Sequence, residues 1–246
     1  MDLQDLAALR DRAAVLVDFD GTLSEIAPTP EEARPVAGAV EALEALGGRF
    51  AVVAVVSGRP AAQVAALTGG RVRCFGLYGL EDTEGGGPVP ALPDRLLARV
   101  REAAAGIEGT RVELKGSHVA LHYRGAEDPD GAGRALREAL GPVAEREGLR
   151  MLEGKRVLEL APAGGPTKGD VIRRVARENG LRAVLYAGDD VADLEAFDAV
   201  EALAGEGVAA FPVAVRTEET PLELLERAGL VVEGPAGLVA LLGSLA

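Results

Sequence analysis

The sequence predicts an α/β protein with a doubly wound parallel sheet and a smaller α+β domain inserted into it. Two stretches, residues 14–77 and 168–197, alternate short apolar runs with helical patterns, which is typical of parallel strands joined by helices. Residues 82–162 lack this alternation and contain paired strand-like runs instead. The chain has 246 residues and is 48% hydrophobic, which is enough for a large core and a smaller insert.

The predicted core elements follow from apolar runs, helical periodicity and glycine or proline at their ends. The first apolar run ends at acidic residues and is followed by Gly21-Thr22, as expected for a buried parallel strand that opens into a loop. The expected elements are strands at 14–19, 50–56, 72–77 and 183–186 and helices at 36–46, 61–67, 168–179 and up to Phe197. Beyond Pro212, helix and strand are expected to complete the core.

The insert is expected to begin where Gly85-Gly86-Gly87-Pro88 breaks the core pattern. Its predicted elements are a helix at 93–105, a hairpin of 112–115 and 119–123, a helix at 131–147 and strands at 149–152 and 156–160. We therefore expect residues 1–81 and 163–246 to form the core domain and residues 82–162 the insert.

Charge and composition limit the partners. The formal net charge is −13 and the isoelectric point about 4.7, so the overall field repels nucleic acid and anionic membranes. The single cysteine, Cys74, cannot form an intramolecular disulfide and is expected in the core. The N-terminus lacks the pattern of a signal peptide, and no apolar stretch reaches the roughly 18 residues of a membrane span. We expect a cytoplasmic, monomeric protein that acts on a small molecule.

The most specific motif is Asp18-Phe19-Asp20-Gly21-Thr22, at the end of the first predicted strand. Ligands of open α/β sheets bind outside the carboxyl ends of the strands, and side chains two apart at a strand end share a face. One carboxylate can then attack phosphorus while the other transfers a proton to the leaving oxygen. A divalent cation would offset the repulsion between these groups and a phosphate. The alternative is an acidic turn that only caps the next segment.

Two further motifs could hold a phosphate. Ser57-Gly58-Arg59 follows the second strand, where a hydroxyl and a backbone N–H can contact phosphate oxygens. Lys168 precedes a helix, and its ammonium could hold the transferring phosphoryl group and the attacking carboxylate together. Taken alone, the first could be a turn with a helix cap and the second a surface lysine.

A second acidic cluster, Gly188-Asp189-Asp190-Val191-Ala192-Asp193, follows another predicted strand. Carboxylate oxygens suit Mg²⁺, which needs only one or two protein carboxylates because it keeps several waters. Asp190 and Asp193 could instead cap the following helix. All four motifs fall on one edge of one predicted sheet, so their chance coincidence is improbable.

In their residues and order, these four motifs resemble those of the haloacid dehalogenase superfamily. The resemblance implies that Asp18 is the nucleophile and Asp20 the general acid/base, while Ser57, Gly58 and Lys168 bind phosphate. It also implies magnesium ligands from Asp18, the main-chain carbonyl of Asp20, and Asp189, with Asp193 orienting the site. The insert lies where this superfamily places an α+β cap, a domain that excludes water and reads the leaving group.

Motifs of the insert resemble those of trehalose-6-phosphate phosphatases. They are Glu113-x-Lys115-x-Ser117, then His122-Tyr123-Arg124, then Gly154-Lys155-x-Val157-x-Glu159. The run 76–81 also resembles this family, although Tyr78 stands where the family often has His, and Ala192 where it often has Thr or Asn. The resemblance implies substrate binding by Arg59, Tyr78, Glu113, Lys115, His122, Lys155 and Glu159, because charged groups suit sugar hydroxyls.

Several readings stay open at this point. Glu113 and Lys115 could lie on a solvated strand face, and His122 could be a buried histidine without a functional role. The leading hypothesis is hydrolysis of trehalose 6-phosphate. The alternatives are a phosphatase for glucosyl- or mannosyl-phosphoglycerate or sucrose phosphate, a phosphosugar mutase, and a catalytically silent module that binds sugar phosphates.

Overall fold

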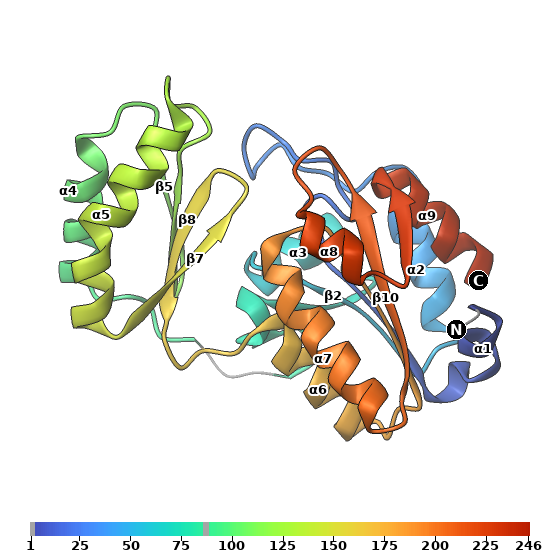
Figure 1. Cartoon of the computed structure of the whole chain (residues 1–246). Helices are drawn as coiled ribbons and strands as arrows, with labels where there is room; N and C mark the ends of the chain where they lie inside the picture. Colours follow the sequence, from blue (N-terminus) through green and yellow to red (C-terminus); the bar gives the residue numbers. More distant parts are fainter. Residues whose placement is uncertain (1–2, 86–88) are drawn as a thin grey trace. The chain divides into compact units, whose positions relative to one another are not determined.

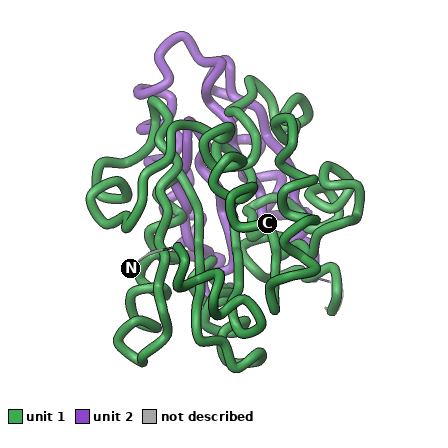
Figure 2. The backbone as a smooth tube through the Cα atoms, turned by 90° about the vertical axis from the view of Figure 1, so that its right-hand side faces the viewer, with its two compact units in different colours: residues 1–86, 166–246 green, residues 87–165 purple. Residues whose placement is uncertain are grey.

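The computed structural model describes residues 3–85 and 89–246 (Figure 1). The chain folds into two compact units (Figure 2). The first unit comprises residues 1–86 and 166–246, and the second comprises residues 87–165. The unit boundaries lie a few residues from those expected for the insert. The predicted break at residues 86–88 lies outside the described residues.

The first unit contains a seven-stranded sheet in the order β11-β10-β9-β1-β2-β3-β4. The strand pairs are parallel except for β3 with β4. The strands are β1 (Ala13–Val17), β2 (Val52–Val56), β3 (Arg73–Gly76), β4 (Glu81–Asp82), β9 (Ala183–Gly188), β10 (Ala209–Arg216) and β11 (Leu230–Glu233). The central strands β1 and β9 are buried along their whole length, which explains their continuous apolar sequence.

Helices cover both faces of this sheet and thereby form the doubly wound arrangement that the sequence predicts. One apolar cluster joins alternate residues of β1, such as Val15 and Val17, to α1, α2, α3 and α9, and a second joins Ala14 and Leu16 to α6, α7 and α8 (Figure 1). The helices are α1 (Leu3–Ala8), α2 (Ala39–Gly47), α3 (Ala61–Leu67), α6 (Lys168–Glu178), α7 (Leu194–Gly205), α8 (Leu222–Arg227) and α9 (Gly234–Leu245). Short 3-10 helices occur at Arg10–Arg12, Leu77–Gly79 and Val191–Asp193.

Two core helices differ from the sequence-based expectation by three or more residues at one end, whereas the predicted strands differ by one or two residues. Helix α2 begins three residues later than predicted, because Gly38 has a left-handed φ of 82° and Val36 donates its N–H to the carbonyl of Leu23. Helix α7 continues well beyond Phe197, to Gly205. The expected completion of the core beyond Pro212 is confirmed by β10, α8, β11 and α9.

The second unit is a four-stranded antiparallel sheet with two helices on one face. The sheet order is β5-β6-β8-β7, with β5 (Arg111–Lys115), β6 (His118–His122), β7 (Leu149–Gly154) and β8 (Val157–Pro162). Apolar residues of β6 and β8 pack against α4 (Asp94–Ala105) and α5 (Pro129–Glu147). Figure 1 shows these two helices side by side on one face of the sheet. The pleat therefore turns the intervening polar residues of these strands to the face without helices.

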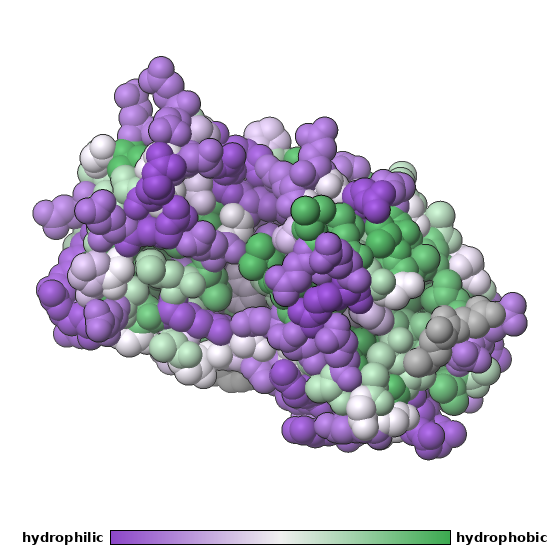
Figure 3. All heavy atoms as spheres, in the orientation of Figure 1, coloured by the Kyte–Doolittle hydropathy of each residue, from purple (hydrophilic) through white to green (hydrophobic). Residues whose placement is uncertain are grey.

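The single cysteine is buried in the core, as its apolar neighbours in the sequence predict. Cys74 is fully buried, and burial raises the pKa of its thiol to about 11, as expected for an unreactive core cysteine. Within the described residues, no helix is both long and apolar enough to cross a bilayer. On the face drawn in Figure 3, hydrophilic side chains cover much of both units.

Candidate active site

The first motif lies at the carboxyl edge of the large sheet, as predicted. Asp18 follows β1 directly, Ser57 follows β2, and Asp189 follows β9. Because β1 pairs in parallel with both β2 and β9, these three positions end neighbouring strands at the same edge. The N–H of Asp18 donates to the carbonyl of Ala187 (2.8 Å), which fixes the nucleophile candidate beside β9.

Lys168 links two of the predicted carboxylates. Its Nζ lies 2.9 Å from Oδ1 of Asp18 and 2.7 Å from Oδ1 of Asp193. Lys168 is 3% exposed, so this is a core ion cluster and not a surface lysine. Burial acts to lower the pKa of Lys168, but the charges of Asp18 and Asp193 outweigh it and raise the pKa, so the ammonium stays protonated.

Asp193 is held by four donors. Its Oδ1 accepts from Lys168 and from the hydroxyl of Tyr186 (2.5 Å), and its Oδ2 accepts from the backbone N–H groups of Asp189 (2.8 Å) and Asp190 (2.9 Å). Burial raises the pKa of Tyr186 well above its usual value, and the negative charge of Asp193 acts in the same direction. Asp193 therefore fixes the chain around Asp189 and the position of Lys168. Sequence reasoning missed Tyr186, which reads there as one more apolar strand residue.

Asp189 is fully buried beside Gly21. Thr22 Oγ1 donates to Oδ1 of Asp189 (2.9 Å). Gly21 has a φ of 80°, and a Cβ placed on it would meet Oδ2 of Asp189 at 2.0 Å. Glycine is therefore required here both by the backbone conformation and by the close approach of a carboxylate. The motif that carries Asp18 thus also shapes the position of Asp189.

The carboxylates of Asp18, Asp189 and Asp193 form a group that could hold a metal ion. Each offers an oxygen, and these oxygens lie within 4.8 Å of one another. The ammonium of Lys168 contacts two of these three buried carboxylates, and the four groups together carry a net charge of −2 if all are ionised. Burial, together with the charge of Asp193, raises the pKa of Asp18 to about 7 against the opposing effect of Lys168.

This donor set fits a hard divalent cation, because carboxylate oxygens are its preferred protein ligands and the excess charge matches its own. Both carboxylate oxygens of Asp193 accept hydrogen bonds, from four protein donors in all. Asp193 is therefore better suited to orienting its neighbours than to binding a metal ion. Asp18 and Asp189 are then the better candidates for direct contact with a metal ion.

Asp20 points to a basic partner. Nε and Nη2 of Arg59 each lie 2.7 Å from one of the two carboxylate oxygens of Asp20. Arg59 is 6% exposed, whereas the side chain of Asp20 is 38% exposed. The carboxylate of Asp20 is therefore turned to Arg59 and is not part of the group formed by Asp18, Asp189 and Asp193. The roles expected for Asp20 as proton carrier and as a carbonyl ligand stay predictions.

Ser57, Gly58 and Tyr78 lie together after β2 and β3. Ser57 is buried, its Oγ accepts from the N–H of Arg59 (3.1 Å), and its carbonyl accepts from the N–H of Tyr78 (3.0 Å). A Cβ placed on Gly58 would meet the hydroxyl of Tyr78 at 2.7 Å, so the tyrosine lies directly against this glycine. Tyr78 has a φ of 59°, a strained conformation for a residue with a side chain. The sequence did not reveal this contact.

Four of the predicted substrate-binding residues of the insert share the sheet face that carries no helix, namely Glu113, Lys115, His122 and Glu159. Nζ of Lys115 lies 3.1 Å from Oε2 of Glu159, and both side chains are buried. Nε2 of His122 lies 2.8 Å from Oε2 of Glu113. Burial acts to raise the pKa of Glu113, but the hydrogen bond with His122 and the charge of Lys115 lower it overall. These contacts argue against a simple solvated face.

The remaining insert residues differ in their surroundings. Lys155 lies in the turn between β7 and β8, where its carbonyl accepts from Nη2 of Arg124 (3.1 Å). His118 pairs in register with Lys115, is 2% exposed, and has its Nδ1 2.9 Å from the hydroxyl of Ser117. Sequence reasoning did not select His118, although its alternation with His122 along one strand places both on the same face.

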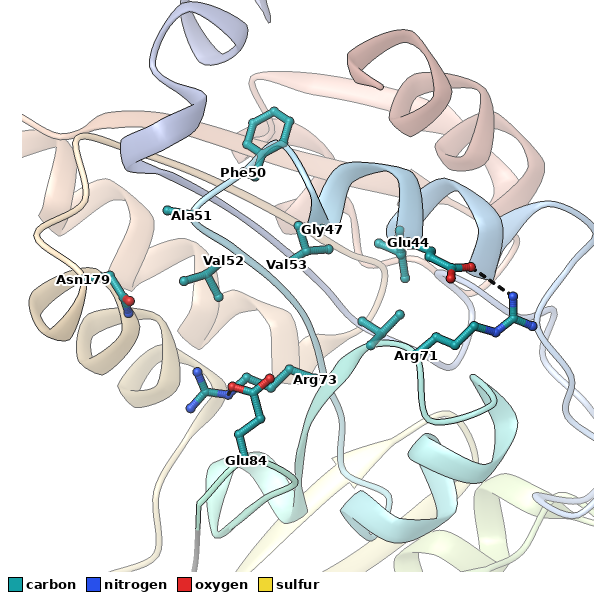
Figure 4. A pocket seen from close by; sticks show the side chains of 12 residues that line it. Glu44, Gly47, Phe50, Ala51, Val52, Val53, Arg71, Arg73, Glu84 and Asn179 are labelled. Atoms are coloured by element: carbon teal, nitrogen blue, oxygen red, sulfur yellow. Dashed lines mark hydrogen bonds and ion pairs between the residues drawn. The ribbon is translucent and has the colours of Figure 1, made fainter.

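A pocket of about 440 Å³ occurs elsewhere in the first unit (Figure 4). Its lining includes Val52 and Arg73, the first residues of β2 and β3, so it opens at the amino edge of the sheet. None of the candidate site residues is among its described lining residues. This pocket is therefore separate from the predicted chemistry.

The fold and the carboxylate cluster define the class of protein. The structure resembles a haloacid dehalogenase-like hydrolase from Bacteroides thetaiotaomicron, with a TM-score of 0.66 and 14% identity over 95% of this chain and 99% of the other. It also resembles the C-terminal domain of a trehalose-6-phosphate phosphatase from C. albicans, with a TM-score of 0.82 and 19% identity over 99% and 94% of the two chains. The core therefore has the haloacid dehalogenase fold.

The sequence comparison identifies the family. A model of the family described as Trehalose-phosphatase matches residues 16–79 and 94–223, which together are most of the chain. The chain is also 38% identical over 206 residues to a trehalose-phosphate phosphatase from Mycobacterium marinum. That match covers 77% of this chain but 52% of the mycobacterial protein, so the chain spans about half the length of that relative. The chain belongs to the trehalose-phosphatase family.

Proposed function

We propose that this protein hydrolyses trehalose 6-phosphate to trehalose and phosphate, with Mg²⁺, through an aspartyl-phosphate formed on Asp18. One observation carries the proposal: a buried carboxylate at the end of β1 lies 2.9 Å from a buried lysine, within a cluster that carries excess negative charge. Membership of the trehalose-phosphatase family supports this assignment.

Asp18 is proposed to attack phosphorus, forming an O–P bond as the bond from phosphorus to the sugar oxygen breaks. Lys168 would hold the attacking carboxylate in place and offset charge on the phosphoryl oxygens. Asp20 would give its proton to the leaving sugar oxygen and later take one from the water that hydrolyses the aspartyl-phosphate. Hydrolysis returns Asp18 as a carboxylate and releases phosphate.

Mg²⁺ would be held by Asp18, Asp189 and the main-chain carbonyl of Asp20, and when bound it would neutralise charge on the phosphate. The support for this assignment is the fit of the donor set to a hard cation described above. Ser57 and Gly58 are proposed to contact phosphate oxygens, since they follow the strand next to β1. Asp193 would keep Lys168 and the loop of Asp189 in position.

The sugar is proposed to be read by charged residues, most of them in the insert. Glu113, Lys115 and Glu159 offer charged groups on one sheet face, and such groups make strong hydrogen bonds to hydroxyls. The set is completed by His122, Lys155 and Tyr78. Because Lys115 and Glu159 are already paired, the pair would orient each group for one sugar hydroxyl.

The test measures phosphate release from a panel of sugar phosphates with Mg²⁺, with and without a chelator, and compares the wild type with Asp18→Asn. We expect trehalose 6-phosphate to be the best substrate, with activity abolished by the substitution and by chelation. No turnover of any ester would favour a silent binding module. Faster turnover of a phosphoglycerate ester or of sucrose phosphate would identify that ester, in place of trehalose 6-phosphate, as the substrate. Formation of an isomerised sugar phosphate would indicate a mutase.

A second comparison tests the role of the insert. Glu113→Ala should lower kcat/KM for trehalose 6-phosphate much more than for a small generic phosphoester. The matched control is Glu153→Ala, which also removes a strand carboxylate of the insert, one paired with Arg137 at 3.0 Å. Equal losses on both esters, or equal effects of the two variants, would mean that Glu113 does not read the sugar.

A further inference from the structure

We infer that Arg59 is a positioning residue that sets the orientation of the Asp20 carboxylate for proton transfer, and that it does not bind the sugar directly. This inference rests on the proposed function, since it concerns the proton carrier of that reaction. It gives Arg59 a different task from the one that the family resemblance implies.

The contact between the two side chains is a two-point contact. Nε of Arg59 lies 2.7 Å from Oδ2 of Asp20, and Nη2 lies 2.7 Å from Oδ1. Two parallel bonds from a planar guanidinium fix the plane of a carboxylate as well as its position. A single ammonium at this place would act as a point charge and leave the carboxylate free to rotate.

Arg59 is itself held from three further directions. Its Nη1 donates to the carbonyl of Pro30 (2.9 Å), its guanidinium carbon lies 5.4 Å from the centre of the Phe19 ring, and its N–H donates to Ser57 Oγ (3.1 Å). With 6% of its surface exposed, Arg59 is the fixed member of the pair. Asp20, with 38% of its side chain exposed, is the member whose direction must be set.

The chemistry assigns the proton to Asp20 and not to Arg59. A guanidinium stays protonated in proteins and accepts no hydrogen bond, so Arg59 cannot carry a proton between the sugar oxygen and water. Its effect on proton transfer must therefore pass through Asp20. The contact of Arg59 with Ser57 also connects the phosphate-binding candidate to the arginine that holds Asp20.

The chain contains a matched arginine for comparison. Arg73 contacts Asp82 at two points, with Nε 3.1 Å from Oδ1 and Nη2 2.7 Å from Oδ2, and it lies over the ring of Phe75 at 4.7 Å. Arg73 begins β3, at the amino edge of the sheet. Arg73→Lys therefore reports what the loss of such a contact does when it is remote from the proposed chemistry.

The experiment compares Arg59→Lys, Asp20→Asn, the double variant and Arg73→Lys. For each, kcat/KM with Mg²⁺ is measured on trehalose 6-phosphate, whose leaving alcohol needs a proton, and on 4-nitrophenyl phosphate, whose leaving group does not. Where steady turnover is too slow, the burst of nitrophenol release reports phosphoryl transfer to Asp18.

We expect Arg59→Lys to lower kcat/KM for trehalose 6-phosphate roughly tenfold or more when Asp20 is present, since general acid catalysis contributes at least about 100-fold. In the Asp20→Asn background, Arg59→Lys should change kcat/KM for trehalose 6-phosphate by less than about twofold. On 4-nitrophenyl phosphate, and for Arg73→Lys on either ester, the change should stay below about twofold.

Thermal unfolding gives a readout that does not depend on activity. If the contact exists in solution, the double variant loses less melting temperature than the two single variants together. The inference would be overturned if Arg59→Lys lowered kcat/KM equally with and without Asp20 on both esters. It would also be overturned if Arg59→Lys left kcat/KM for trehalose 6-phosphate unchanged or raised it, or if the melting-temperature shifts of the two single variants were additive in the double variant. No turnover of either ester by the wild type would instead overturn the proposed function, and this inference with it.

Discussion

Replacing Lys168 with methionine removes the ammonium that two buried carboxylates share. Asp18 and Asp193 are 5% and 0% exposed, and Nζ lies 2.9 and 2.7 Å from their respective Oδ1 atoms. Methionine has nearly the same length, so the change is one of charge more than of volume. We expect both folding and phosphoryl transfer to suffer, because the same contacts serve both.

The magnitude follows from burial. Removing one partner of a buried ion pair costs about 3–5 kcal/mol, because the other charge stays uncompensated. Asp193 keeps three other donors, and Asp18 can take up a proton because burial already raises its pKa to about 7, so we expect the lower part of that range. For a chain of this size this corresponds to a melting temperature lower by roughly 6–12 °C.

The assay is thermal unfolding in a chelator at pH 7.5, followed by calorimetry or circular dichroism, with turnover measured separately. The control is Arg71→Met, which breaks the exposed pair of Arg71 with Glu44 (3.0 Å) and should cost at most about 1 kcal/mol. Turnover of the Lys168→Met variant should fall at least about 100-fold. A melting temperature within 2–3 °C of the control variant, together with retained turnover, would refute the reasoning.

Three further predictions concern other buried groups. Tyr186→Phe removes the hydroxyl that donates to Asp193 and should lower the free energy of unfolding by about 1.5–3 kcal/mol in urea titrations, whereas no change would mean that this bond is not formed. Asp189→Asn should weaken Mg²⁺ binding at least about tenfold in calorimetric titrations, and undiminished affinity would remove Asp189 from the ligand set. Burial lowers the pKa of His118, so the folded insert resists its protonation, and stability present above pH 6.5 is lost as the pH falls. His118→Gln should flatten this slope between about pH 6.5 and 5 in unfolding measurements, and an unchanged slope would assign it to other groups.

The sequence predicted the doubly wound fold and the edge at which polar residues gather, because both depend on local signals. Buried parallel strands need continuous apolar runs, and the residues after β1, β2 and β9 meet because these strands pair in parallel. The late start of α2 was missed, since the left-handed φ of Gly38 depends on the contact between Val36 and Leu23.

Two contacts between distant side chains could not be predicted from the sequence. The two-point contact of Asp20 with Arg59 spans 39 positions, and the contact of Glu159 with Lys115 spans 44. Such pairs depend on side-chain direction and on sheet register, neither of which composition or periodicity specifies. Tyr186 was missed for a related reason, because an aromatic residue inside an apolar strand gives no sign that its hydroxyl meets a carboxylate.

The four aspartates of the proposed site differ in the way in which their carboxylates are held. Asp193 accepts four bonds from the fold and serves as a support, whereas Asp18 is held at Oδ1 by a lysine that also offsets charge. Asp189 is held at Oδ1 by a hydroxyl, which leaves its negative charge uncompensated by that contact and suited to a cation. Asp20 faces an arginine that can orient it but cannot exchange a proton with it. The proposed roles of support, nucleophile, metal ligand and proton carrier therefore each agree with the hydrogen-bonding partner of the acid concerned.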